Sequence, residues 1–169
     1  MKVIDYNGQG FWSVGEILKR YKEYARVFGI SQPRELTART HSEGDTKWIY
    51  PLMDSVIEGI EAGDSGCAEI GIEFIETSDS FSFGMTLKSN VARALRRTPL
   101  TDAQKERIRR RVVEMLEVEY LPAEFRQYAK LARKLGLREC MPRIKQLAES
   151  SANPWVHRYC AYFEENASH

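Results

Sequence analysis

The sequence has few of the residues that would crosslink a fold or hold it in a membrane. Only three of its 169 residues are cysteines, and Cys67, Cys140 and Cys160 are too scattered to form a disulfide framework. No apolar run approaches the 18 residues that a membrane-spanning helix needs, and residues 1–5 lack the apolar core of a signal peptide. These absences predict free thiols, a cytoplasmic location and no membrane partner.

Alternation of apolar and polar residues with a period of two, the pattern of half-buried strands, is also missing. Apolar residues instead recur at helical spacing in segments with short linkers, so the sequence predicts a single all-α domain over residues 1–169. An irregular arm or short strand is expected at 1–12, and a long loop at 30–45 with room for a short helix at 33–40. The expected helices are 13–28, 48–62, 66–76, 83–97, 102–118, 122–135, 139–149 and 154–165. Thr101 with Gln104 is expected to cap the helix at 102–118, and Trp155, Tyr159, Tyr162 and Phe163 of the last helix are expected to face inward.

Two segments, residues 122–131 and 154–163, repeat one pattern 32 positions apart. A period of about 30–45 residues is typical of stacked helical repeats, because each helix pair needs a neighbour to bury its apolar face. The matched positions are Pro122 and Pro154, Arg126 and Arg158, Ala129 and Ala161, and Leu131 and Phe163.

The later helices form three consecutive pairs, which are 66–76 with 83–97, 102–118 with 122–135, and 139–149 with 154–165. Residues 137–147 as a first helix, followed by residues 153–161 as a second, resemble the HEAT-like repeats of α-solenoids. The resemblance spans about residues 66–165 and implies a short solenoid whose second helices line a concave surface. A compact helical bundle is the alternative.

Charge is distributed unevenly along the chain. Residues 1–87 hold 8 Lys and Arg against 14 Asp and Glu, whereas residues 88–145 hold 16 against 7, and the remainder holds 1 against 3. This asymmetry predicts a molecule with one basic face.

The basic residues recur on expected second helices, opposite the apolar stripes. With the resemblance to HEAT-like repeats, they are expected to line one basic groove, to which Lys88 and His157 also contribute; a solvated face partly neutralised by Glu124 and Glu139 is the alternative. Glu69, Glu73 and Glu76 form an acidic stripe on a first helix, expected to be solvated and to face outward. The predicted binding residues are Arg93, Arg96, Arg97, Arg126, Lys130, Arg133, Lys134 and Arg158.

One short motif suggests catalysis. Residues 63–66, Gly-Asp-Ser-Gly, resemble the nucleophile segment of chymotrypsin-type serine proteases, which also require a His and an Asp on a β-barrel scaffold. Here the motif lies between two expected helices, where Asp64 and Ser65 are expected to cap and glycine to turn the chain. The sequence therefore predicts no catalytic residues and no enzyme.

A metal site is considered for Cys140, His157 and Cys160, because the last two lie three residues apart on one expected helix. Zinc sites normally have closely paired ligands, and structural ones have four. A buried cysteine and a surface histidine explain these residues better, so neither a metal nor another cofactor is predicted.

Two functions follow from these features. The first is a non-enzymatic adaptor, or an inhibitor or immunity protein, that binds an acidic protein surface through the basic groove. The alternative is nucleic-acid binding, since similar folds in DNA-alkylation-repair glycosylases use a basic concave face. Against the alternative, the basic run at 107–111 shares its helix with four glutamates, no aromatic residue is interleaved for base stacking, and the isoelectric point is about 7.7. The oligomeric state is left open.

Overall fold

The protein forms two compact units, Met1–Leu100 and Thr101–His169. The computed structural model describes residues 1–79 and 82–166. Helices of the α and 3₁₀ types hold 63% of these residues, so the predicted predominance of helix is confirmed. No helix in the described part of the chain combines the length and the apolar character that crossing a membrane requires.

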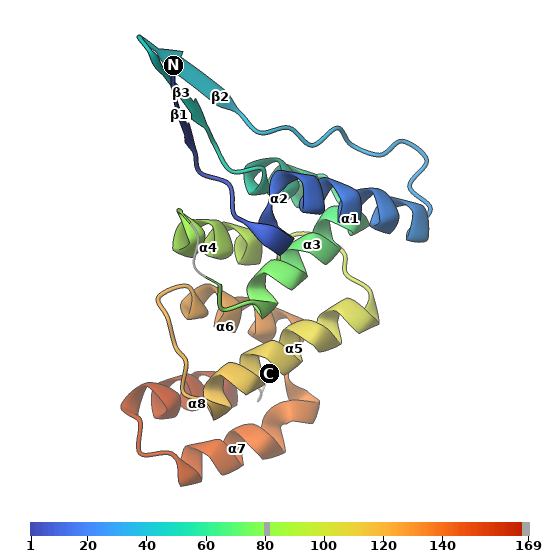
Figure 1. Cartoon of the computed structure of the whole chain (residues 1–169). Helices are drawn as coiled ribbons and strands as arrows, with labels where there is room; N and C mark the ends of the chain where they lie inside the picture. Colours follow the sequence, from blue (N-terminus) through green and yellow to red (C-terminus); the bar gives the residue numbers. More distant parts are fainter. Residues whose placement is uncertain (80–81, 167–169) are drawn as a thin grey trace. The chain divides into compact units, whose positions relative to one another are not determined.

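In the first unit, four α-helices enclose one apolar core (Figure 1). They are α1 (Val14–Val27), α2 (Met53–Glu61), α3 (Ser65–Glu76) and α4 (Gly84–Leu95), and a 3₁₀ turn at Gly10–Trp12 precedes α1. Helix α3 packs against each of the other three helices, which explains why it is apolar on almost every side. The largest fully buried side chains here are Ile17, Leu52, Ile60, Ile70, Ile72, Phe74, Ile75 and Leu95.

A small sheet extends from the helices of this unit (Figure 1); one of its strands lies in the segment 1–12, where an irregular arm or short strand was expected, but the other two strands were not predicted. Strand β1 (Lys2–Asp5) pairs in parallel with β3 (Thr46–Ile49), and β2 (Thr40–Glu43) pairs antiparallel with β3. Each strand has four residues, and no residue of the sheet is buried. These strands therefore lack the alternation of apolar and polar residues by which a half-buried strand is recognised in a sequence.

The sheet corrects two expectations about the chain between α1 and α2. The segment 30–45, expected to be a loop, contains β2, and residues 33–39 form no helix. The helix expected from residue 48 begins only at Met53, because Thr46–Ile49 pairs in the sheet and Pro51 disfavours helical backbone at the residue before it.

The second unit consists of two helix pairs in succession (Figure 1). They are α5 (Asp102–Glu117) with α6 (Phe125–Leu135), and α7 (Met141–Ser150) with α8 (Pro154–Asn166). Besides these pairs, α5 packs against α7 and α6 packs against α8. In this unit the first helices of the two pairs contact each other, and so do the second helices.

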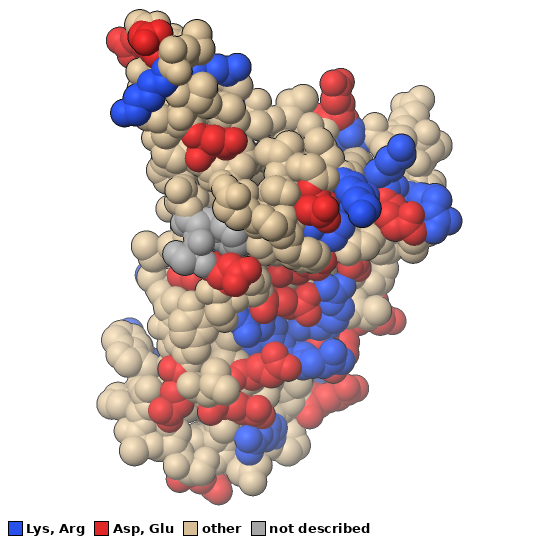
Figure 2. All heavy atoms as spheres, viewed as in Figure 1, with Lys and Arg blue, Asp and Glu red and all other residues tan. Residues whose placement is uncertain are grey.

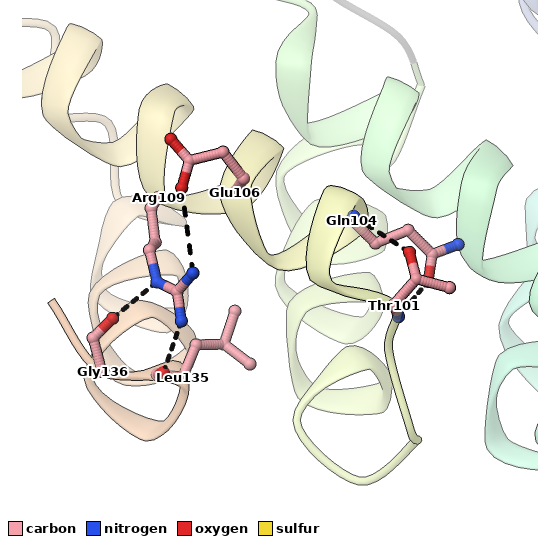
Figure 3. Close-up of polar contacts among 6 residues, drawn as sticks. All are labelled: Thr101, Gln104, Glu106, Arg109, Leu135 and Gly136. Carbon is pink, nitrogen blue, oxygen red and sulfur yellow. Dashed lines mark hydrogen bonds and ion pairs between the residues drawn. The ribbon is translucent and has the colours of Figure 1, made fainter. Parts of the chain in front are cut away.

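Local interactions fix the ends of these helices. Thr101 and Gln104 form a reciprocal capping box at the start of α5, as predicted from their spacing (Figure 3). At the end of α6, the Arg109 guanidinium donates to the carbonyl oxygens of Leu135, at 2.8 Å, and Gly136, at 2.6 Å (Figure 3). Gly136 has a φ of +86°, which terminates the helix at little cost for a residue without a Cβ.

Candidate binding groove

A groove of about 600 Å³ in the second unit is lined by α6, the turn before it, and α8. The first wall consists of Leu121, Pro122, Ala123, Arg126, Ala129 and Lys130. The second consists of Trp155, Arg158, Tyr159 and Tyr162. The two segments of the sequence repeat therefore form the two walls of one groove.

The repeat places equivalent residues in this groove. Arg126 and Arg158 stand four residues after Pro122 and Pro154, and both arginines line the groove from different helices. Pro122 lies in the turn before α6, and within the helix Arg126, Ala129 and Lys130, spaced by three and four residues, lie on one face and continue the same wall.

The groove has cations without counter-charges. Its lining contains Arg126, Lys130 and Arg158 and no carboxylate. No carboxylate among the described residues forms an ion pair with any of these three side chains. Three positive charges around one volume create a potential that attracts an anionic group.

Aromatic side chains lie among these cations, and this corrects two expectations. Trp155, Tyr159 and Tyr162 were expected to point into the core, but all three line the groove, and Trp155 is 56% exposed. The expectation that no aromatic residue is interleaved with the basic ones is also wrong. The spacing of positions 155, 158, 159 and 162 places aromatic and basic residues on one face of α8.

The aromatic residues are held by contacts on both sides of the groove. The Tyr159 ring packs edge to face against buried Phe125, with 4.7 Å between centroids, and the Arg158 guanidinium lies 5.3 Å from the Trp155 ring. Burial raises the pKa of Tyr159, while the nearby charges of Arg126 and Arg158 lower it. Both arginines therefore act on the same phenol.

Two other predicted residues of α6 lie outside the groove lining. Arg133 donates to the Tyr162 hydroxyl at 3.3 Å and lies 5.3 Å from its ring, so it supports a wall residue from the side. Lys134 is exposed on the last turn of the helix. Of the predicted residues in this unit, Arg126, Lys130 and Arg158 are thus brought together.

The predicted residues of α4 and its end belong to the first unit. Arg93 is exposed and donates to Asn90 Oδ1 at 2.8 Å, Arg97 is exposed, and Arg96 is partly buried. Lys88, expected on the basic face, is 4% exposed, and its ammonium group donates to the Thr77 carbonyl oxygen at 2.6 Å. That lysine closes the end of α3 and is unavailable to a partner.

The acidic stripe on α3 also differs from the expectation. Glu69, Glu73 and Glu76 are each partly buried rather than fully solvated. The Glu73 carboxylate lies 3.5 Å from Arg20 Nε, and the two side chains are only 15% and 12% exposed. Arg20 also covers the Phe11 ring, at 3.5 Å, so this ion pair fastens the start of the chain to α3.

The Gly-Asp-Ser-Gly motif has a structural explanation. Asp64 caps α3, because its Oδ1 accepts from the Cys67 amide at 3.0 Å, and its Oδ2 accepts from the Tyr21 hydroxyl at 2.6 Å. Ser65 is the first helical residue rather than a cap, which corrects the role expected for it.

The three residues considered as metal ligands lie in different environments. Cys160 is buried, Cys140 is partly buried, and His157 is exposed with its Nε2 bonded to the Ser151 carbonyl oxygen. Within residues 1–79 and 82–166, no group of three or more His, Cys, Asp or Glu side chains is arranged to hold a metal ion.

The basic run on α5 does not form an exposed basic patch of its own. Arg109 caps α6 and lies 3.9 Å from Glu106 (Figure 3). Where α5 lies in Figure 1, the molecular surface shows Lys and Arg atoms beside Asp and Glu atoms (Figure 2).

Comparisons with protein-family models, curated proteins and solved structures give no match to this chain.

Proposed function

We propose that this chain is a non-enzymatic, cytoplasmic binding protein that holds an acidic segment of another protein in the groove between α6 and α8. One observation carries the proposal: three cations without counter-charges and three aromatic side chains line a single groove. An adaptor, or an inhibitor or immunity protein, fits this description because such proteins act by occupancy alone.

The residue types in the groove support a protein partner. Trp, Tyr and Arg are the residues that dominate binding energy at protein interfaces, because they combine large apolar area with a polar group. The groove contains Trp155, Tyr159, Tyr162, Arg126 and Arg158. An exposed Trp155 beside unpaired arginines provides both the apolar and the charged half of such an interface.

The packing of the second unit supports a HEAT-like stack of two repeats. In such a stack, first helices contact first helices and second helices contact second helices. The contacts of α5 with α7 and of α6 with α8 follow this pattern. The groove then lies on the surface formed by second helices, where proteins with stacked repeats bind partners.

Nucleic-acid binding is the second candidate, and the aromatic residues among the cations favour it more than the sequence did. A base can stack on Trp155 while Arg126, Lys130 or Arg158 contacts a phosphate. The mixed charge over α5 disfavours a long polyanion (Figure 2).

The experiment compares two variants that remove equal charge. The groove variant is Arg126→Gln, Lys130→Gln, Arg158→Gln; the control is Arg110→Gln, Arg138→Gln, Lys145→Gln, whose three residues are exposed and lie outside the groove lining. A partner captured from the host is purified, and its affinity for each variant is measured by calorimetry. We expect a loss of at least about tenfold in the groove variant and little change in the control.

Equal affinities for the groove variant and the wild type would disprove the proposal. A generic single-stranded oligonucleotide is titrated in parallel at two salt concentrations. Groove-dependent binding that falls steeply with salt, in the absence of any protein partner, would favour the second candidate.

A further inference from the structure

The groove has a charged part and an apolar part that adjoin, since the Arg158 guanidinium lies 5.3 Å from the Trp155 ring. Arg126, Arg158 and Tyr159 line the charged part, and the charges of both arginines act on the Tyr159 phenol. Trp155 offers an exposed indole, and Leu121, Pro122 and Ala123 add apolar surface on the opposite wall. A ligand that fills both parts needs an anionic group and a bulky apolar group close together.

The charged part suits a carboxylate. A carboxylate has two oxygens that accept several hydrogen bonds, and a guanidinium donates two parallel bonds to such a group. The Tyr159 hydroxyl provides a further donor in the same region. A phosphate monoester shares this acceptor chemistry but carries more charge and is larger, so it serves as a competing probe.

The size and charge of the groove disfavour a long polyanion. About 600 Å³ accommodates two large side chains with their backbone and falls within the range of small-ligand pockets. Single-stranded nucleic acid requires cations along a track, whereas this groove has three around one volume.

We infer that the groove recognises a short extended segment of its partner in which an Asp or Glu stands next to a bulky apolar residue. The carboxylate binds between Arg126 and Arg158, and the apolar side chain packs on Trp155. The inference rests on the proposed function and specifies which feature of the partner is recognised.

Peptides of defined sequence test the inference without the natural partner. Four capped hexapeptides are compared, with an Asp-Leu, Asn-Leu, Asp-Gly or Lys-Leu step in an otherwise uncharged sequence. Dissociation constants come from amide shift changes in ¹⁵N-labelled full-length protein, which also report where each peptide binds. We expect the Asp-Leu peptide to shift residues of α6 and α8, and the other three to bind at least about tenfold more weakly.

Variants assign the two parts of the groove separately. Arg126→Gln, which leaves the contact between Arg158 and Trp155 in place, should abolish the preference for Asp-Leu over Asn-Leu and retain the preference for Leu over Gly. Trp155→Ala should have the opposite effect, and Arg110→Gln, on the exposed face of α5, should change neither. Intact amide spectra of each variant establish that the fold is retained.

Three outcomes would overturn the inference. They are equal affinities for the Asp-Leu and Asn-Leu peptides, tighter groove binding by inorganic phosphate, and tighter groove binding by a ten-residue oligothymidylate. If the peptides fail while the captured partner still depends on the groove residues, the inference is wrong and the proposed function stands. If the captured partner ignores the groove variant, the proposed function is wrong.

Discussion

Arg126 and Arg158 occupy the same position in two copies of a 32-residue repeat and line the same groove. Each stands four residues after a proline near the start of its helix, and α6 packs against α8. Duplicating one helix with an arginine at a fixed position therefore delivers two guanidinium groups to one site. The repeat accounts for the charged part of the groove as well as for its walls.

The Asp64 cap should be essential for stability, and the neighbouring serine should not. Asp64→Ala removes hydrogen bonds to the Cys67 amide and the Tyr21 hydroxyl, so we expect a loss of about 1–3 kcal/mol in the free energy of unfolding. Ser65→Ala should change it by less than about 0.5 kcal/mol. Urea unfolding measures the free energy of unfolding of both variants, and a larger loss for Ser65→Ala would mean that Ser65 contributes to capping the helix.

Close packing of α2 and α3 at Gly59 predicts a coupled pair of variants. A Cβ at Gly59 would lie 2.3 Å from Cys67 Sγ, so Gly59→Ala should destabilise by about 1–3 kcal/mol. Replacing Cys67 by Ala removes that sulfur, and the double variant should lose less stability than the two single losses added together. Gly15→Ala on α1, where nothing lies within 4 Å, is the control and should not destabilise. If the two losses in the free energy of unfolding are additive, the strain in Gly59→Ala does not come from the Cys67 sulfur.

Arg109 should contribute to stability rather than to binding. Arg109→Ala leaves the Leu135 and Gly136 carbonyl oxygens without their guanidinium donor, and we expect a loss of about 1–3 kcal/mol. Arg110→Ala, exposed on the same helix, should be nearly neutral. Chemical denaturation of both variants provides the test, and equal stabilities would contradict the capping role.

The protein should lose stability at alkaline pH through its partly buried tyrosines. Burial, followed by the hydrogen bond to Glu73, raises the pKa of Tyr24 from 10.0 to about 12. Because the folded-state pKa exceeds the unfolded value, the stabilisation is complete below pH 10 and is lost as the pH rises to about 12. The free energy of unfolding should fall less steeply over this range in Tyr24→Phe, and identical slopes would contradict the assignment.

The sequence predicted the helices well where an apolar stripe faces a core. Ile108, Val112, Met115 and Leu116 recur at helical spacing, and all four are buried in α5. Two strands of the sheet, β2 and β3, were missed for the converse reason, since they are short and no residue in them is buried. Hydrophobic periodicity arises when an element is buried on one side. A strand without a buried side therefore cannot be predicted from it.

The candidate site was predicted in part because charge is visible in sequence and burial is not. Arg126, Lys130 and Arg158 were identified from their helical spacing, and all three line the groove. Lys88 has the same charge but is buried, because the carbonyl oxygens at the end of α3 solvate its ammonium group. Trp155 was misassigned to the core, since an exposed indole and a buried one have the same spacing on a helix.

Repulsion between Lys130 and the cations one turn away on α6 should make the free protein less stable than it could be. Lys130 is separated by four residues from both Arg126 and Lys134 and by three from Arg133, all positive. Like charges at these spacings destabilise a helix by about 0.2–0.5 kcal/mol per pair. Lys130→Gln should therefore raise the free energy of unfolding by a few tenths to about 1 kcal/mol at low ionic strength, since Gln and Lys have similar helix propensities.

Salt and a matched lysine separate this charge effect from a general benefit of glutamine. Lys145, on α7, is followed four residues later by Glu149, so Lys145→Gln should be neutral or slightly destabilising. Urea unfolding at about 0.01 M and about 1 M salt spans screening lengths of about 30 to 3 Å, and the gain from Lys130→Gln should vanish at the higher concentration. A variant less stable than the wild type at low salt would mean that Lys130 has a counter-charge in the free protein. The expected result would mean that Lys130 and the cations one turn away on α6 repel each other in the free protein.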